Sequence, residues 1–197
     1  MFNNGSPKSL EEAKNHAKKK TLKYRERDAA KRAEFIETIA AIPEEYLVYV
    51  DETGIDKYLY RPYARAARGK AVYGKVSGKR YKRTSIVAGQ YQKRIVAPLQ
   101  YSGTMDSALF LLWFVTMLLP CLAPGCVIIM DNARFHCKSK LIPAAHHAGC
   151  RILFLPPYSP DLNIIEFFWG WLKSRLRKIL PSFHSLDAAI TDCFNVK

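Results

Sequence analysis

The sequence predicts an α/β fold. Apolar residues make up 49% of the 197 residues and charged residues 24%, which is enough to bury the core of one domain. From residue 46 onward, short β-prone runs and helical patterns follow one another as strand, strand, strand, helix, strand, helix, strand, helix. These two observations indicate a sheet of five strands with helices.

The first 42 residues differ from the rest because they carry ten basic and six acidic residues and few large apolar ones. They predict one or two solvated helices that end at Pro43. Two interpretations stay open, an exposed arm that packs on the domain and a linker that leads in from an upstream part. We therefore expect a basic helical arm or linker over residues 1–44 and the main domain over residues 45–197.

The three first strands are expected at residues 46–51, 81–90 and 94–101. The last two read as antiparallel neighbours joined by a turn near Gln92 and Lys93. The remaining elements are expected as helices over residues 106–119, 139–148 and 163–180 and strands over residues 126–130 and 151–155, with Pro and Gly at their ends.

Composition also excludes some classes of protein. The longest apolar run, residues 108–119, is shorter than the roughly 20 residues that a membrane span needs. Five cysteines without a pairing pattern disfavour a secreted disulfide scaffold, and no apolar signal segment begins the chain.

Three carboxylates are candidates for a site. Asp51 and Asp131 each follow an apolar strand, and the carboxyl ends of strands in α/β sheets border ligand crevices. Each also has a structural explanation, as a turn residue before Gly54 or as a cap of the next segment. Glu166 stands three residues after Asn163, as in a capping box, and that role is compatible with a catalytic one.

Three carboxylates in one crevice would suit Mg²⁺, and two such ions about 3.5–4 Å apart support phosphodiester chemistry. His136 follows Asp131 by five residues, so it either reaches the same crevice or is an ordinary core or surface histidine.

The net charge of +14 points to a polyanionic partner. Residues 57–94 hold twelve lysines or arginines, no acid and six tyrosines, which favours nucleic acid contact over a solvated hairpin face. The basic residues that we expect to contact DNA are Arg61, Arg65, Arg68, Lys70, Lys79, Arg80, Lys82 and Arg83.

Three motifs together resemble a known family. They are DETG at residues 51–54, MDNARFH at 130–136 and LPPYSPDLNIIE at 155–166, with 34 residues between Asp131 and Glu166. They resemble the catalytic domain of bacterial insertion-sequence transposases, DDE enzymes of the Tc/mariner superfamily. The resemblance implies a ribonuclease H-like fold, with a mixed five-stranded sheet flanked by helices.

The same resemblance implies that Asp51, Asp131 and Glu166 bind two Mg²⁺ ions, or Mn²⁺, and that Asn132 and His136 assist. It implies hydrolysis of double-stranded DNA at transposon ends, strand transfer into target DNA, a homodimer on DNA and a place at the bacterial nucleoid in the cytoplasm.

Two departures from the family pattern matter. Ile164 stands where the family usually has proline, and residues 1–42 are too short for the family's N-terminal helix-turn-helix domains, so we expect a separate N-terminal half. Two alternatives stay open, a catalytically silent DNA-binding remnant and a structure-specific nuclease of the same fold.

Overall fold

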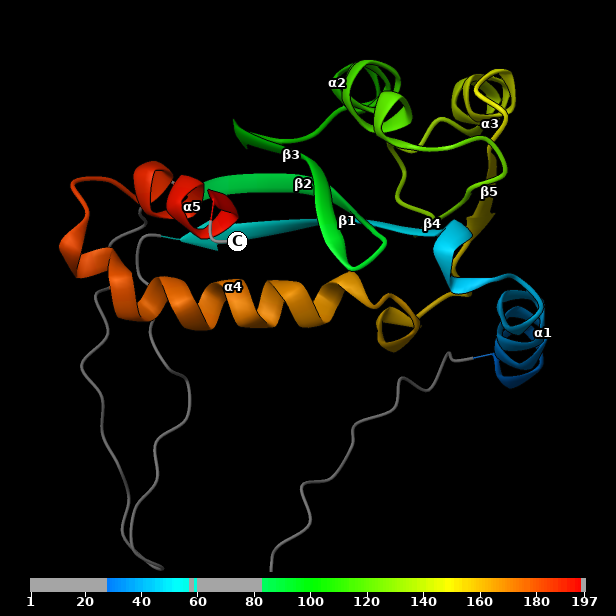
Figure 1. Ribbon diagram of the computed structural model, residues 1–197, viewed down its shortest axis with the longest axis horizontal. Coiled ribbons are helices and arrows are strands. Elements are labelled where there is room, and N and C mark those ends of the chain that lie inside the picture. The colour runs from blue at the N-terminus through cyan, green and yellow to red at the C-terminus, as the bar shows by residue number, and fades with distance from the viewer. Residues whose placement is uncertain (1–27, 57–58, 60–82, 196–197) are drawn as a thin grey trace, which may run out of the picture.

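The computed structural model describes residues 28–56, 59 and 83–195. One mixed sheet lies at its centre, with the strand order β3-β2-β1-β4-β5 (Figure 1). Antiparallel pairing joins β1 to β2 and β2 to β3, whereas β4 and β5 run parallel to β1. This arrangement confirms the expected mixed five-stranded α/β sheet. The strands are β1 (Leu47–Asp56), β2 (Arg83–Tyr91), β3 (Arg94–Ser102), β4 (Val127–Met130) and β5 (Arg151–Phe154).

Helices cover both faces of this sheet. On one face, α2 and α3 pack over Val48, Val50 and Ile128. On the other face, α1, α4 and α5 pack over Tyr49 and Ile129, and Figure 1 shows α4 lying along the sheet opposite α2 and α3. The helices are α1 (Ala29–Ala40), α2 (Ser107–Trp113), α3 (Lys138–His147), α4 (Ile165–Ile179) and α5 (Leu186–Asn195).

Local sequence signals explain several boundaries. The β2–β3 turn falls at Gln92 and Lys93, which have φ values of 48° and 63°, so the expected hairpin is confirmed. The carboxylate of Asp106 accepts hydrogen bonds from the backbone N–H groups of Ala108 and Leu109 and thereby begins α2.

Two expected boundaries are wrong, and one helix was not predicted. The first strand does not end at Asp51, because β2 pairs with β1 from Val48 to Asp56 and extends it. The predicted helix over residues 106–119 is α-helical only to Trp113 and continues as a π-helix over Phe114–Leu118 and a 3₁₀ turn over Leu119–Cys121. The helix α5 was not expected at all.

The helix α1 packs onto the same core as α4. Phe35 is 5% exposed and lies in the cluster that contains Tyr49 and Trp169. The guanidinium of Arg32 donates to both carboxylate oxygens of Asp161, at 3.2 and 2.8 Å, and so ties α1 to the loop before α4. The division of the chain at residues 44 and 45 stays a prediction.

Among the described residues, no helix is both long enough and apolar enough to cross a lipid bilayer.

Candidate active site

Asp51, Asp131 and Glu166 line one pocket of about 450 Å³. The sheet register brings the two aspartates there. Tyr49 pairs with Ile129 across the parallel strands β1 and β4, so Asp51 and Asp131 each lie two residues beyond a paired position. Glu166 comes from the first turn of α4, which covers this face of the sheet. Asn132 and Asn163 also line the pocket.

Asp51 is partly buried against α4. The indole N–H of Trp169 donates to its Oδ2 at 3.0 Å. The pKa of Asp51 is raised to about 7, chiefly because the carboxyl group is buried, and the negative charges of Glu166 and Asp131 contribute to the rise. The hydrogen bond from Trp169 acts in the opposite direction. Ionising Asp51 is therefore costly in the folded protein.

Asp131 lies in a different environment, because its side chain is 56% exposed. The Nδ1 atom of His136 lies 3.1 Å from its Oδ1 and 3.0 Å from its backbone oxygen. Since both of these oxygens are acceptors, Nδ1 carries the proton. The backbone N–H of Ala133 donates to the same Oδ1 at 3.0 Å. The hydrogen bond from His136 is the main reason that the pKa of Asp131 is lowered.

His136 thus reaches the crevice, and its position is well defined. It is 9% exposed and its ring lies 4.2 Å from the ring of Phe110 and 4.5 Å from that of Phe135, measured between centroids. These contacts hold the imidazole beside Asp131. Its part in a reaction stays a prediction.

The capping box considered as a structural explanation for Asn163 and Glu166 is not formed. Asn163 is 3% exposed, and its side-chain amide donates to the backbone oxygen of Val50 at 3.2 Å. The N-cap position of α4 is Ile164, which makes no side-chain cap. Glu166 is exposed at the pocket instead of closing the helix start. Asn163 therefore links the start of α4 to the residue before Asp51.

Asn132 also joins two strand ends. Its side-chain amide donates to the backbone oxygen of Leu155 at 3.4 Å, a long hydrogen bond between the segments after β4 and β5. Asn132 thus lines the same pocket as the three acids. Its part in a reaction stays a prediction.

Glu52 is not a fourth acid of this pocket. Side chains alternate along a strand, so Glu52 points to the opposite face of the sheet from Asp51. There its Oε2 accepts a hydrogen bond from Tyr101 at 2.9 Å, and burial raises its pKa.

The arrangement suits a hard cation by the chemistry of its donors, since three carboxylates face one pocket and repel one another. Within the part of the chain that the structure describes, no three His, Cys, Asp or Glu side chains surround a common point closely enough to hold a metal ion as they stand. Asp131 and Glu166 are both exposed at the pocket, so ions from solvent can reach their carboxylates.

Of the basic residues expected to contact DNA, Arg83 alone lies among the described residues. It is exposed on β2, and its guanidinium occupies the space beside Gly54, where a Cβ atom would clash with it. The others, Arg61, Arg65, Arg68, Lys70, Lys79, Arg80 and Lys82, lie outside the described residues.

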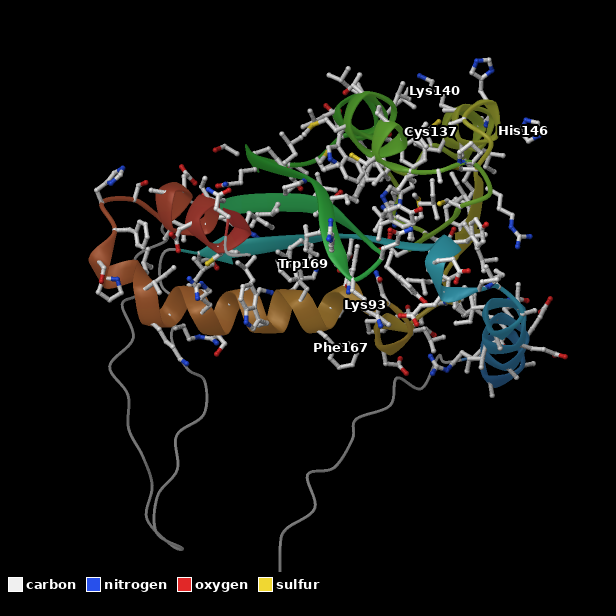
Figure 2. The ribbon with its side chains drawn as sticks, in the orientation of Figure 1. Lys93, Cys137, Lys140, His146, Phe167 and Trp169 are labelled. Carbon is white, nitrogen blue, oxygen red and sulfur yellow. The ribbon has the colours of Figure 1, made fainter. Side chains whose placement is uncertain are left out.

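Sequence reasoning missed two contacts of Asp51 and its strand, namely those made by Trp169 and Asn163. The only signal was position. Trp169 follows Glu166 by three residues and so lies near it on the helix surface. Figure 2 shows the side chain of Trp169 turned toward the sheet and that of Phe167 turned away from it.

Comparison with known proteins gives a family and a fold. The sequence model described as "DDE superfamily endonuclease" matches residues 46–188. The structure is similar to the Mos1 transposase paired-end complex with left transposon end, with a TM-score of 0.71 and 16% identity over 95% of this chain and 61% of that one. It is also similar to the catalytic domain of Mos1 mariner transposase, with a TM-score of 0.60 and 14% identity over 90% of this chain and 86% of that one. These similarities confirm the ribonuclease H-like fold.

A curated relative covers a smaller part of the chain. The "Uncharacterized protein y4pE/y4sA" of Sinorhizobium fredii is 34% identical over 73 residues, which are 34% of this chain and 47% of that protein. The chain thus spans about half the length of this relative.

Proposed function

Because the chain belongs to the DDE superfamily of endonucleases, we propose that it is the catalytic part of a DNA transposase. In this proposal it hydrolyses a phosphodiester at a transposon end and then joins the freed 3′-hydroxyl to target DNA. The observation that carries the proposal is the convergence of Asp51, Asp131 and Glu166 on one pocket, from two strand ends and one helix start.

The chemistry consists of two displacements at phosphorus. In the first, a water oxygen bonds to phosphorus, the bond to the 3′ oxygen breaks, and that oxygen takes a proton to become a hydroxyl. In the second, this hydroxyl loses its proton and bonds to a target phosphorus, whose own bond to a 3′ oxygen breaks. Positioning and charge stabilisation are what the protein has to supply for both.

We propose that Asp51, Asp131 and Glu166 hold Mg²⁺ or Mn²⁺, as two ions, for this chemistry. The Mos1 mariner paired-end complex has been solved with Mn and with Mg. Divalent cations held there would lower the pKa of bound water and neutralise charge on the phosphate. Burial is the main cause of the raised pKa of Asp51, and repulsion by Glu166 and Asp131 adds to it. A cation would relieve this repulsion, which supports the donor set.

The residues around the acids have defined tasks in the proposal. His136 holds the carboxylate of Asp131 and directs its hydrogen-bonded oxygen, and Asn132 fixes the chain that follows. The basic residues of the segment between β1 and β2, together with Arg83, contact the DNA phosphates. Residues 45–197 form the catalytic domain, residues 1–44 the linker, and end recognition comes from a separate N-terminal half in a homodimer on DNA.

The test is cleavage of supercoiled plasmid with Mg²⁺ or Mn²⁺ and with EDTA, for the wild type, Asp131→Ala and Glu45→Ala. Glu45 is an exposed acid outside the pocket and serves as the matched control. We expect nicking that requires the cation, persists in Glu45→Ala and falls by about 10³-fold or more in Asp131→Ala. A pre-nicked oligonucleotide with a free 3′-hydroxyl then tests strand transfer.

Four results would contradict the proposal. Nicking that survives EDTA or the Asp131→Ala change would remove the triad from the chemistry. DNA binding without cation-dependent chemistry, even with the N-terminal half added in trans, would favour a silent remnant, and nicking without joining would favour a nuclease.

A further inference from the structure

Trp169 is a core residue whose indole N–H donates a hydrogen bond to Asp51, one of the three acids. Its side chain is 1% exposed and packs with Ile165, Leu172 and Leu176. Its indole N–H, however, ends on Oδ2 of Asp51, 118 residues away in the sequence. A buried indole needs an acceptor, and a backbone oxygen would satisfy it equally well.

Trp113 illustrates that ordinary solution on the other face of the sheet. It is also 1% exposed, and its indole N–H donates to the backbone oxygen of Ala97 at 2.7 Å. The two tryptophans thus have the same burial and each makes an indole hydrogen bond, but only that of Trp169 ends on a carboxylate of the candidate site.

We propose that Trp169 is a positioning residue, which holds the carboxylate of Asp51 in the orientation that binds the divalent cation. This inference rests on the proposed function. Glu166 and Asp131 repel Asp51, and without a restraint its carboxylate would turn away from them. The hydrogen bond from Trp169 opposes this rotation at one oxygen.

A neutral donor suits the task better than a charged one. An arginine or lysine at this place would also hold the carboxylate, but its charge would cancel part of the negative potential that attracts the cation. The indole N–H restrains Asp51 without adding a positive charge. Hydrogen-bonded partners of this kind orient metal ligands, and their loss typically weakens metal binding about 10- to 100-fold.

Helix α4 carries both Glu166 and Trp169, the residue that restrains Asp51. Buried side chains on either side of Trp169 fix the indole, and three residues before Glu166 the amide of Asn163 donates to the backbone oxygen of Val50. Helix α4 is therefore bound to β1 at two points, one on each side of Glu166 in the sequence. A shift of α4 relative to β1 would strain or break these hydrogen bonds.

The experiment compares Trp169→Phe with Trp113→Phe in the full chain. Both changes remove one buried indole N–H and keep an aromatic ring. Mn²⁺ binding is measured without DNA by electron paramagnetic resonance of the free ion, and thermal unfolding is measured in EDTA. We expect the dissociation constant for Mn²⁺ to rise about 10-fold or more in Trp169→Phe and to stay unchanged in Trp113→Phe.

The structural alternative predicts something different, namely that both variants lose thermal stability and neither loses Mn²⁺ affinity. A dissociation constant within about two-fold of the wild type in Trp169→Phe would overturn the inference, because a lost orienting partner costs about 10-fold or more. Should Trp169→Phe not fold, benzothienylalanine at position 169 keeps the shape of the ring system and replaces N–H by sulfur. The same affinity criterion applies to it.

Two further variants separate the inference from the proposed function. Asp51→Asn should lose Mn²⁺ binding, and adding Trp169→Phe to it should have no further effect, because the restrained carboxylate is already gone. If wild type and Asp51→Asn bind Mn²⁺ equally, the metal site of the proposed function fails and the inference fails with it. If Asp51→Asn loses binding and Trp169→Phe does not, the inference alone fails.

Discussion

Asp51 and Asp131 follow similar apolar stretches and face the same pocket, but their surroundings are opposite in kind. Asp51 is partly buried beneath α4, and burial raises its pKa to about 7. Asp131 is exposed, and hydrogen bonds from His136 and from the backbone of Ala133 lower its pKa. One carboxylate is costly to ionise in the folded protein, and the other is ionised readily.

This difference shows that only one of the two aspartates, Asp51, lowers the stability of the folded protein when it is ionised. Asp131 gains from its partners when it is charged, whereas the charge on Asp51 opposes folding as long as no cation is present. A bound cation would reverse the sign for Asp51, because it favours the charged form. The two acids should therefore respond in opposite directions to the same substitution.

The largest expected effect is that of Asp51→Asn on stability. Asparagine keeps an oxygen that accepts from Trp169 and carries no charge, so the variant escapes the cost of an ionised carboxylate. A pKa near 7 instead of 3.8 corresponds to at most about 4 kcal/mol at 1.36 kcal/mol per unit. We expect the free energy of unfolding at pH 8 in EDTA, measured by urea denaturation, to rise by up to this amount.

Asp131→Asn is the matched control for this change and should lower the free energy of unfolding. Because Asp131 is more than half exposed and screened by solvent, we expect a loss below about 1 kcal/mol. Destabilisation by Asp51→Asn, or stabilisation by Asp131→Asn, would contradict the comparison.

The dependence of stability on pH gives a second contrast. The folded protein keeps the proton of Asp51 up to about pH 7, whereas the unfolded chain releases it near its ordinary pKa of 3.8. Between these values the unfolded state binds fewer protons, so the contribution of Asp51 lowers stability as pH rises. We expect urea midpoints in EDTA to fall more steeply from pH 5 to about pH 7 in the wild type than in Asp51→Asn. Equal slopes would show that Asp51 titrates normally.

Much of the fold could be predicted because local signals set it. Apolar runs between Pro and Gly placed the strands, and the β2–β3 turn fell at Gln92 and Lys93 as expected. The extension of β1 to Asp56 was not visible, since it depends on pairing with β2, whose partner residues lie from 27 (Asp56 with Arg83) to 35 (Glu52 with Val87) positions further along the chain. The helix α5 has an amphipathic pattern that the sequence reading did not use.

The three acids of the site could be predicted from the sequence, but the residues that hold them in place could not. Motif spacing and strand ends brought Asp51, Asp131 and Glu166 together, and the structure places all three at one pocket. The contact between Trp169 and Asp51 spans 118 residues, so no local pattern encodes it. The role of Asn163 was not predicted, because an asparagine before a helix has the same sequence pattern whether or not it caps that helix. Here its side chain donates to the backbone oxygen of Val50 instead.

The smallest expected effect comes from His136→Phe, which tests the other half of the comparison. Phenylalanine keeps an aromatic ring against Phe110 and Phe135 and removes the hydrogen bond to Asp131. Because that hydrogen bond is the main cause of the lowered pKa of Asp131, the pKa should move up toward its ordinary value of 3.8. Carboxyl ¹³C chemical shifts of Asp131 during an acid titration measure this movement, and Asp51 should titrate as in the wild type. We expect a loss of about 0.5 kcal/mol of stability, the lower end for one hydrogen bond, because Asp131 is screened by solvent. An unchanged titration of Asp131 would mean that the backbone N–H of Ala133 suffices to hold its charge, and that the two aspartates differ only in burial.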